Sequence, residues 1–236
     1  MPAAARAAGA ASGVPERILS LWFGQAHRIV PRAARHSALS DPAYLKGMGK
    51  HWYFGGAEMD ARCQPFEPLL ADARAGRLAG REWESDGGLL ALIILTDQLA
   101  RNIHRGSARA FAWDDLALAA GATFVRQRSR YRALSLAERN FVAMPFMHSE
   151  ERADHSACWE LFAESKADFP ACEAFTASSL AYLAEHTAVL DRFGRYPHRN
   201  AALGRASSAE EVAWLAEEAP GWARSQIANK PDEAPD

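Results

Sequence analysis

Three short segments of the chain carry more polar and charged side chains than a helix end or a turn requires. They cover residues 97–102 with His104 and Arg105 following, residues 144–150, and residues 192–200. Each contains side chains that bind anions or exchange protons. Arg donates hydrogen bonds in a fork that matches carboxylate and phosphate, and His titrates near neutral pH. These segments are therefore the first candidates for a functional site.

The first segment follows the most hydrophobic stretch of the chain. Asp97 and Arg101 are four residues apart, so on a helix they lie on one face and can form an ion pair. A buried carboxylate requires such a partner. Two interpretations stay open. Either the pair is structural and closes a helix end, or the remaining donors of Arg101 and the amide of Asn102 face a ligand.

The second segment lies where one helix is expected to end and the next to begin. His148 would precede a helix N-terminus, whose free backbone N–H groups favour a neutral imidazole and a bound anion. His148 and Glu150 could then act as an acid–base pair. The alternative is an ordinary turn with a helix cap.

The third segment packs three Arg, one His and one Asn into nine residues that also contain Gly194 and Pro197. Arg forks, an imidazole and an amide on a stiff loop are typical of an anion-binding site. His186, two helical turns earlier on an apolar stripe, is interpreted as a core residue. The candidate ligand-binding residues are Asp97, Arg101, Asn102, His148, Glu150, Arg195, His198, Arg199 and Asn200, with His148, Glu150 and His198 as candidates for an acid or base.

Other chemistries lack their motifs. The sequence contains no HExxH zinc motif, no GxSxG nucleophile motif and no Walker phosphate loop. Glu151 and His155 form a single weak pair where a di-iron helix bundle requires repeated Glu-x-x-His pairs. We therefore predict neither a metal nor a cofactor, and whether any reaction is catalysed stays open.

Composition excludes several classes of partner. The 236 residues carry 27 Lys and Arg against 29 Asp and Glu, a formal net charge of −2. This balance provides no overall attraction to nucleic acid or to an anionic membrane. The longest apolar run, residues 89–95, is far shorter than the roughly 20 residues that span a bilayer. Three cysteines without CxxC spacing and no signal peptide predict reduced thiols and a cytoplasmic location.

The apolar spacing predicts an all-α fold of eight or nine helices in stacked antiparallel pairs, without a strand. A single domain would cover residues 14–222, between flexible tails at residues 1–13 and 223–236. Cap residues are expected at Asp114 or Asp115, at Ser149, and in capping boxes that begin at Ser135 and Ser207. Pro145 is expected to end a helix. The expected helices cover about residues 15–24, 41–53, 57–75 with a kink at Pro65 and Pro68, 86–102, 114–128, 135–145, 149–167, 171–193 and 207–219.

These segments also resemble the motifs of a widespread family of bacterial proteins catalogued as domain of unknown function 924. The similar segments are residues 22–24, 52–56, 97–102, 105–111, 144–150 and 192–205. The resemblance covers about residues 14–222 and departs at Leu99-Ala100, where the family usually has Phe-Pro. The family is similar to the tetratricopeptide-like helical superfamily, which implies an α–α layered fold. The resemblance implies no settled activity.

Three functions remain to be distinguished. The leading hypothesis is a pocket for a small polar or anionic molecule. The second makes this pocket an enzyme site, with His148 or His198 as acid or base and Arg199 or Arg101 stabilising charge. The third is a helical scaffold that binds a peptide partner in a concave groove. The pocket hypotheses require the three segments to lie within about 15 Å of each other, the span of a small-molecule site.

Overall fold

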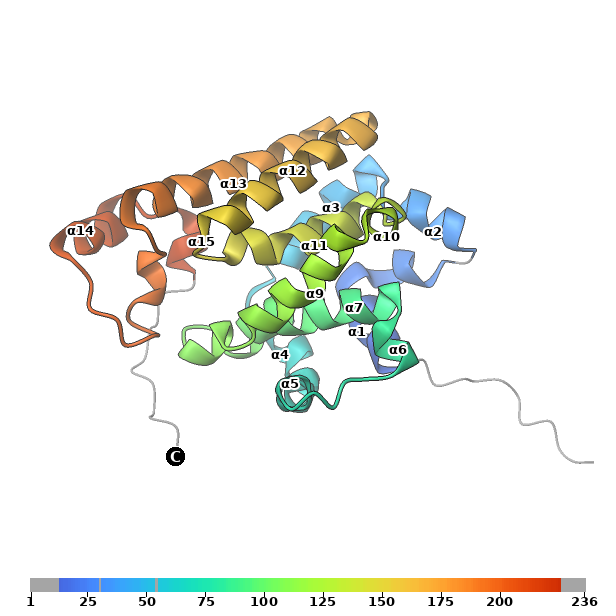
Figure 1. The fold of residues 1–236 in the computed structure, drawn as a ribbon, viewed down its shortest axis with the longest axis horizontal. Coiled ribbons are helices and arrows are strands. Elements are labelled where there is room, and N and C mark those ends of the chain that lie inside the picture. Colours follow the sequence, from blue (N-terminus) through green and yellow to red (C-terminus); the bar gives the residue numbers. More distant parts are fainter. Residues whose placement is uncertain (1–12, 30, 54, 226–236) are drawn as a thin grey trace, which may run out of the picture.

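The computed structural model describes residues 13–29, 31–53 and 55–225, and these residues form helices and connections without a strand (Figure 1). The all-α prediction is confirmed. The predicted tails cover residues 1–13 and 223–236. Of these, residues 1–12 and 226–236 lie outside the described residues. Within the described part, no helix combines the length and the apolar character that crossing a membrane requires.

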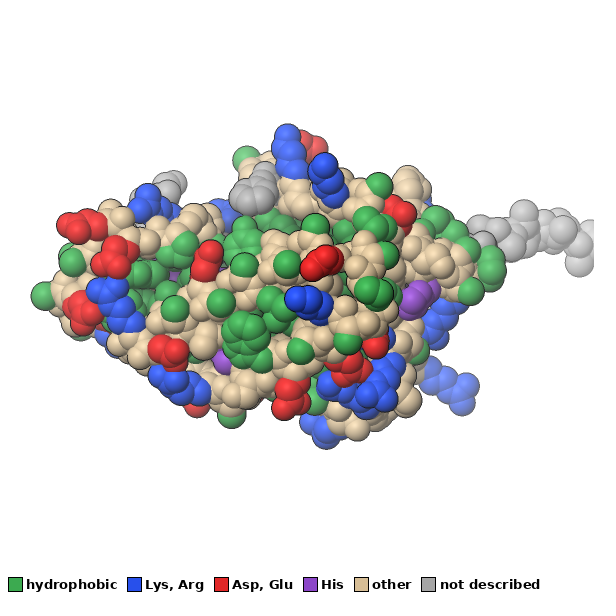
Figure 2. All heavy atoms as spheres, turned by 90° about the horizontal axis from the view of Figure 1, so that it is seen from above, with side chains coloured by type: hydrophobic (Ala, Val, Ile, Leu, Met, Phe, Trp, Pro, Cys, Tyr) green, Lys and Arg blue, Asp and Glu red, His purple; other side chains and the backbone are tan. Residues whose placement is uncertain are grey.

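Three consecutive helices form one side of the molecule. These are α11 (Leu136–His148), α12 (Arg152–Asp168) and α13 (Glu173–Phe193). α12 packs against both α11 and α13, and the two longest helices, α12 and α13, run side by side along the top of Figure 1. Charged side chains of both signs are interspersed on the face seen in Figure 2, so no large patch of one sign covers it.

The hydrophobic centre lies between these helices and the N-terminal half. α7 (Asp86–Ile93) packs against α1 (Val14–Phe23), α9 (Asp114–Arg126) and α11, because it has apolar side chains on every face. The ring of Phe141 meets those of Trp22, Phe23 and Trp52 edge to face, at centroid distances of 5.4, 5.7 and 5.1 Å. The aromatic residues at 22, 23 and 52 are therefore core residues.

Shorter helices complete the described chain. They are α2 (Arg32–Ala38), α3 (Pro42–Tyr53), α4 (Gly56–Cys63), α5 (Glu67–Arg74), α6 (Arg81–Glu84), α8 (Ala100–Ile103), α10 (Arg128–Arg132), α14 (Ala209–Glu217) and α15 (Gly221–Arg224). The expected kink at Pro65 and Pro68 is confirmed, since the 3-10 segment η2 (Gln64–Phe66) separates α4 from α5. The predicted eight or nine helices are too few, because such breaks divide long helices and because α2, α6 and α15 were not expected.

Several predicted helix ends are confirmed. Gly24 ends α1 with φ of 63°, and Gly194 ends α13 in the left-handed conformation with φ of 69°, which side chains with a Cβ rarely adopt. The capping box from Ser135 to Glu138 opens α11. Asp41 accepts a hydrogen bond from the backbone N–H of Tyr44 and so caps α3.

Two predictions around the second polar segment are wrong. Pro145 does not end α11, which continues to His148. Met144, Phe146 and Met147 are buried around Pro145, so packing outweighs the one backbone hydrogen bond that proline removes. Ser149 does not cap α12, because Glu151 occupies the cap position.

Two further caps were misplaced. Trp113 precedes α9, and Asp114 and Asp115 lie in its first turn, where they bind Arg101 and Arg74 instead of the helix end. The last capping box joins Ser208 to Glu211, one residue after the predicted pair. Both registers fit the sequence, and in the observed one Glu211 also forms an ion pair with Arg195.

Candidate functional site

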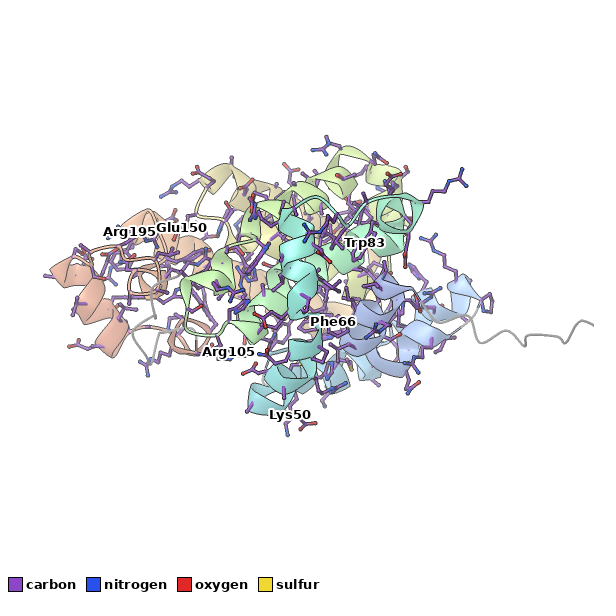
Figure 3. The ribbon with its side chains drawn as sticks, turned by 90° about the horizontal axis from the view of Figure 1, so that it is seen from below. Lys50, Phe66, Trp83, Arg105, Glu150 and Arg195 are labelled. Carbon is purple, nitrogen blue, oxygen red and sulfur yellow. The ribbon has the colours of Figure 1, made fainter. Side chains whose placement is uncertain are left out.

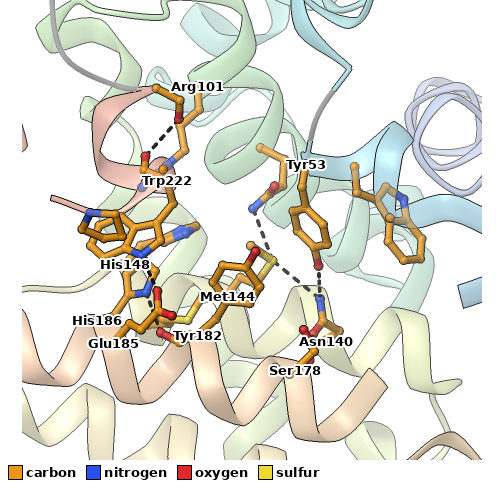
Figure 4. A pocket seen from close by; sticks show the side chains of 18 of the residues that line it. Tyr53, Arg101, Asn140, Met144, His148, Ser178, Tyr182, Glu185, His186 and Trp222 are labelled. Atoms are coloured by element: carbon orange, nitrogen blue, oxygen red, sulfur yellow. Dashed lines mark hydrogen bonds between the residues drawn. The ribbon is translucent and has the colours of Figure 1, made fainter. Parts of the chain in front are cut away.

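A cavity of about 730 Å³ lies between α3, α11 and α13, and α15 covers one end of it (Figure 4). Its volume is typical of sites for small molecules. One end, the polar end, is formed by Arg101, His148, His198 and Arg199. The rest, the apolar arm, is formed mainly by Leu45, Trp52, Met144, Phe162 and Phe175. The structure therefore brings together residues from all three polar segments.

Asp97 lies directly behind the polar end and is fully buried. It belongs to the π-helical segment η3 (Ile94–Leu99), which connects α7 to α8. Turns of this kind are rare and frequently occur at functional sites. Its Oδ1 is 2.7 Å from Nδ1 of His148 and 2.9 Å from Nη1 of Arg101. Burial alone would raise the pKa of Asp97, but the nearby charges and hydrogen bonds of Arg101 and His148 hold it below its ordinary value.

His148 is the last residue of α11, not the residue before a helix N-terminus. Burial lowers its pKa, and the opposing effect of Asp97 does not restore it. The ring is therefore neutral at neutral pH. Because ionised Asp97 only accepts hydrogen bonds, Nδ1 carries the proton and donates it. This leaves Nε2 with a free lone pair, and no other described group hydrogen-bonds to it.

Arg101 is the more fully paired of the two buried arginines. Its Nη1 and Nη2 donate to the two carboxylate oxygens of Asp114 at 2.8 and 2.9 Å, and Nη1 also donates to the backbone carbonyl of Asp97 at 2.7 Å. A bidentate pair of this kind fixes both partners. Arg101 thus holds Asp97 and Asp114 in place, which agrees with the structural interpretation of the Asp97–Arg101 pair.

Arg199 is less fully paired. It belongs to the 3-10 segment η6 (Pro197–Arg199) and is 7% exposed. Its Nη2 donates to the backbone carbonyl of His148 at 2.8 Å, whereas Nη1 lies 3.5 Å from the carboxylate of Asp114. The guanidinium stands 4.7 Å from the ring centres of both Phe111 and Tyr196. Its Nε is buried and has no hydrogen-bond partner within the described chain.

His198 and His186 complete the polar end beside Trp222 of α15. The Nδ1 of His198 is buried without a partner in the described ranges, and burial, with Arg199 nearby, holds the pKa of His198 well below its ordinary value. His186 stacks on Trp222 with ring centres 3.7 Å apart and donates from Nδ1 to the carbonyl of Tyr182. His186 is buried, as expected of a core residue, but it also lines the cavity.

Besides Asp97, which lies behind the polar end, three predicted site residues do not line the cavity. Glu150 accepts hydrogen bonds from Arg205 at 2.7 and 3.0 Å, and Arg195 forms a two-pronged ion pair with Glu211. Figure 3 shows Glu150 and Arg195 close together at one end of the molecule. Asn200 accepts a hydrogen bond from Arg205 as well. These contacts fold the third segment and attach it to the start of α12.

Asn102 does line the cavity, but its amide is engaged: it donates to the carbonyl of Gln98 and accepts from Arg105. Sequence reasoning missed Trp222, because α15 crosses residue 222, where the predicted domain ends and the predicted flexible tail begins. It also missed the apolar arm, since side chains such as Phe162 and Phe175 give the same signal as ordinary core residues.

Across the described residues, no group of three His, Cys, Asp or Glu side chains is arranged to hold a metal ion.

Comparisons with known proteins agree with the motifs. The family model described as bacterial protein of unknown function (DUF924) matches residues 18–219. A solved structure of a protein of unknown function from Agrobacterium tumefaciens is 29% identical to this chain, with a TM-score of 0.61 over 80% of this chain and 100% of that one. No curated protein is similar enough to be matched. The chain therefore belongs to DUF924, a family of bacterial proteins of unknown function.

Proposed function

We propose that the protein binds a small organic anion at the polar end of the cavity. The observation that carries the proposal is the guanidinium of Arg199, which is buried while its Nε has no partner in the described chain. A buried charge is stable only when it is paired and hydrogen-bonded. An anion at the polar end would accept from Arg199, and the neutral ring of His198 would supply a second hydrogen bond.

The distribution of charge supports an anion. The cations Arg101, Arg105 and Arg199 line the cavity, whereas the carboxylates of Asp97 and Asp114 are not part of its lining. At the polar end, the charged side chains that face the cavity are therefore cations, and their carboxylate partners lie behind them. Glu185, an acidic residue that does line the cavity, accepts a hydrogen bond from Nε1 of Trp222. The burial of the polar end favours a small molecule over the peptide of the scaffold hypothesis, because Arg101, His198 and Arg199 are each at most 8% exposed.

Calorimetry with a panel of carboxylates and phosphates tests the proposal. Replacement Arg199→Gln removes the charge and the guanidinium fork and leaves a shorter polar side chain, so we expect affinity to fall by at least tenfold. The matched control is Arg192→Gln, which changes an exposed arginine of α13 that pairs with Glu210 and Glu218 outside the cavity. Equal affinity of the wild type and Arg199→Gln for every anion that binds would contradict the proposal.

A second candidate function rests on a different observation, the Asp97–His148 pair. A neutral His148 oriented by a carboxylate, with Nε2 free, has the geometry of a general base. It would take a proton from water or from a ligand hydroxyl group, and Arg199 would stabilise the negative charge that develops. The test is turnover of bound ligands by the wild type and by His148→Gln. Turnover that is unchanged in His148→Gln would exclude this role.

A further inference from the structure

The apolar arm is an unusual neighbour for an anion site. Its walls come from α3, α11, α12 and α13, and its side chains are Leu45, Trp52, Met144, Phe162 and Phe175. The first four of these are at least 93% buried. Trp52 and Phe175 face each other edge to face with ring centres 6.5 Å apart. Binding hydrocarbon against such a surface is favourable because it removes apolar area from water, whereas binding a polar group there is not.

The cavity is elongated along two helices. On α13 its lining extends from Phe175 to His186, which are eleven positions or about 16 Å apart along the helix. On α11 it extends from Asn140 to His148, which are eight positions or about 12 Å apart. Figure 4 shows His148 and His186 at one end and Asn140 at the other, with Met144 between them. A ligand that fills the cavity is therefore elongated.

The polar atoms at the far end of the arm are already paired. The amide of Asn140 donates to the hydroxyl of Tyr53 and accepts from the hydroxyl of Ser179. Lys46, the cation on this side, is exposed, so water solvates its charge. Among the described residues that line the cavity, the buried side-chain atoms that lack a partner are instead on His198 and Arg199 at the polar end. The ligand's polar group thus belongs at one end only.

The charge of that group follows from the ion pairs around it. Arg101 is paired with Asp97 and Asp114, and Arg105 is paired with Asp60. Arg199 lies 3.5 Å from Asp114, which Arg101 already binds through both carboxylate oxygens, and its Nε has no partner among the described residues. Within the described polar end, Arg199 is therefore the cation with a donor to offer, and burial holds the histidine rings beside it neutral. A single available cation matches a monoanion such as a carboxylate better than a dianion.

We infer that the ligand is an amphipathic monocarboxylate, with its carboxylate at Arg199 and a hydrocarbon chain or ring along the apolar arm. This inference rests on the proposed function, since it identifies the class of anion that the same site takes. The adaptable side chain of Met144 in the middle of the arm suits hydrocarbon groups of differing shape.

Calorimetry of the full chain with straight-chain carboxylates, from acetate to decanoate, tests the inference. Each added methylene that enters the arm should lower the dissociation constant about three- to fourfold, until the arm is filled. The methyl ester of each acid is the control for charge and should bind at least tenfold more weakly. Binding that is independent of chain length would overturn the inference. Binding of ester and acid with equal affinity would overturn the proposed anion site and leave the arm intact.

A pair of matched variants locates the hydrocarbon chain. Ser178 is exposed and lines the arm, whereas the adjacent, exposed Ala177 does not. Ser178→Trp should therefore lower the affinity for decanoate at least tenfold and leave the affinity for acetate or butyrate unchanged. Ala177→Trp should leave the affinities for long and short carboxylates unchanged. Arg199→Gln should weaken carboxylates of every length. Unchanged decanoate binding in Ser178→Trp would overturn the apolar arm as the binding site. A wild type that binds no carboxylate of any length would overturn this inference, and if it bound no phosphate either, the proposed anion site would be wrong as well.

Discussion

Nδ1 of His148 lies 2.7 Å from Oδ1 of Asp97, fifty-one positions earlier in the chain. This contact joins the second polar segment to the first. The backbone carbonyl of the same histidine accepts a hydrogen bond from Arg199, which joins the third segment to the second. His148 is thus the residue at which the three segments meet. The polar end depends on its position.

Replacing Asp97 by Asn should destabilise the fold. The change removes the charge that pairs with Arg101 and leaves a buried network incomplete, which costs about 3 kcal/mol. Urea unfolding measures the loss. Asp72→Asn, in an exposed ion pair with Arg77, is the control and should cost less than about 1 kcal/mol. If Asp97→Asn lost no more than this control, the network would not stabilise the fold.

Stability should decrease as the pH falls below about 6.5. The folded protein holds His148, His186 and His198 at pKa values below the ordinary 6.5, so below pH 6.5 the unfolded chain binds more protons than the folded one. Each such group can remove about 1.4 kcal/mol per pH unit, down to its own folded pKa. Urea unfolding between pH 7.5 and 5 gives the slope.

The variant His198→Gln shows how much of this slope belongs to one ring. Because glutamine does not titrate, the unfolding free energy of this variant should fall less steeply below pH 6.5 than that of the wild type. The comparison uses the difference between slopes, so a constant loss of stability in the variant does not affect it. Parallel slopes would mean that His198 is not held neutral by burial.

The tautomer of His148 can be observed directly. Nitrogen-15 NMR of histidine-labelled protein at pH 7 should show a neutral ring with the proton on Nδ1, because ionised Asp97 accepts it. In a labelled His148→Gln sample this signal should be missing, which assigns it. A ring protonated on Nε2 at pH 7 would be incompatible with the Asp97–His148 contact and with His148 as a base acting through Nε2.

Trp222 should stabilise the C-terminal end of the described chain. Trp222→Leu removes the stack on His186 and one hydrogen bond to Glu185, so a loss of about 1–2 kcal/mol is expected. The pKa of His186 should rise toward its ordinary value as its ring becomes hydrated, which histidine NMR titration detects. The control is Trp159→Leu, at a tryptophan of α12 that is 37% exposed. An unchanged His186 titration in Trp222→Leu would show that the tryptophan does not cover that ring.

Local sequence patterns predicted most of the helices, because apolar spacing and cap residues act over a few positions. Pro145 shows their limit, since burial of its neighbours decides whether the helix continues. Asp114 shows another: its position indicated a helix cap, but its actual partner, Arg101, is determined by tertiary structure. The sequence also indicated which segments were polar, but not that Glu150 would pair with Arg205 while Nδ1 of His198 would find no partner in the described chain.

The apolar arm lay beyond sequence reasoning for a physical reason. A side chain such as Phe162 is apolar whether it fills a core or lines a cavity, and the difference depends on space left by residues far away in the chain. Trp222 was missed because it follows Pro220 in a segment with little apolar periodicity. Its place is fixed by the stack on His186, which only the folded chain brings near.

The most direct test of the anion site is the Nε–H resonance of Arg199 in nitrogen-15 NMR spectra, assigned by its loss in Arg199→Gln. Saturating decanoate should move this resonance strongly, because the carboxylate supplies the partner that Nε lacks in the described chain. The Nε–H of Arg192, outside the cavity, should stay in place. If decanoate binds and the Arg199 resonance does not move, the carboxylate is held elsewhere and the central claim is wrong.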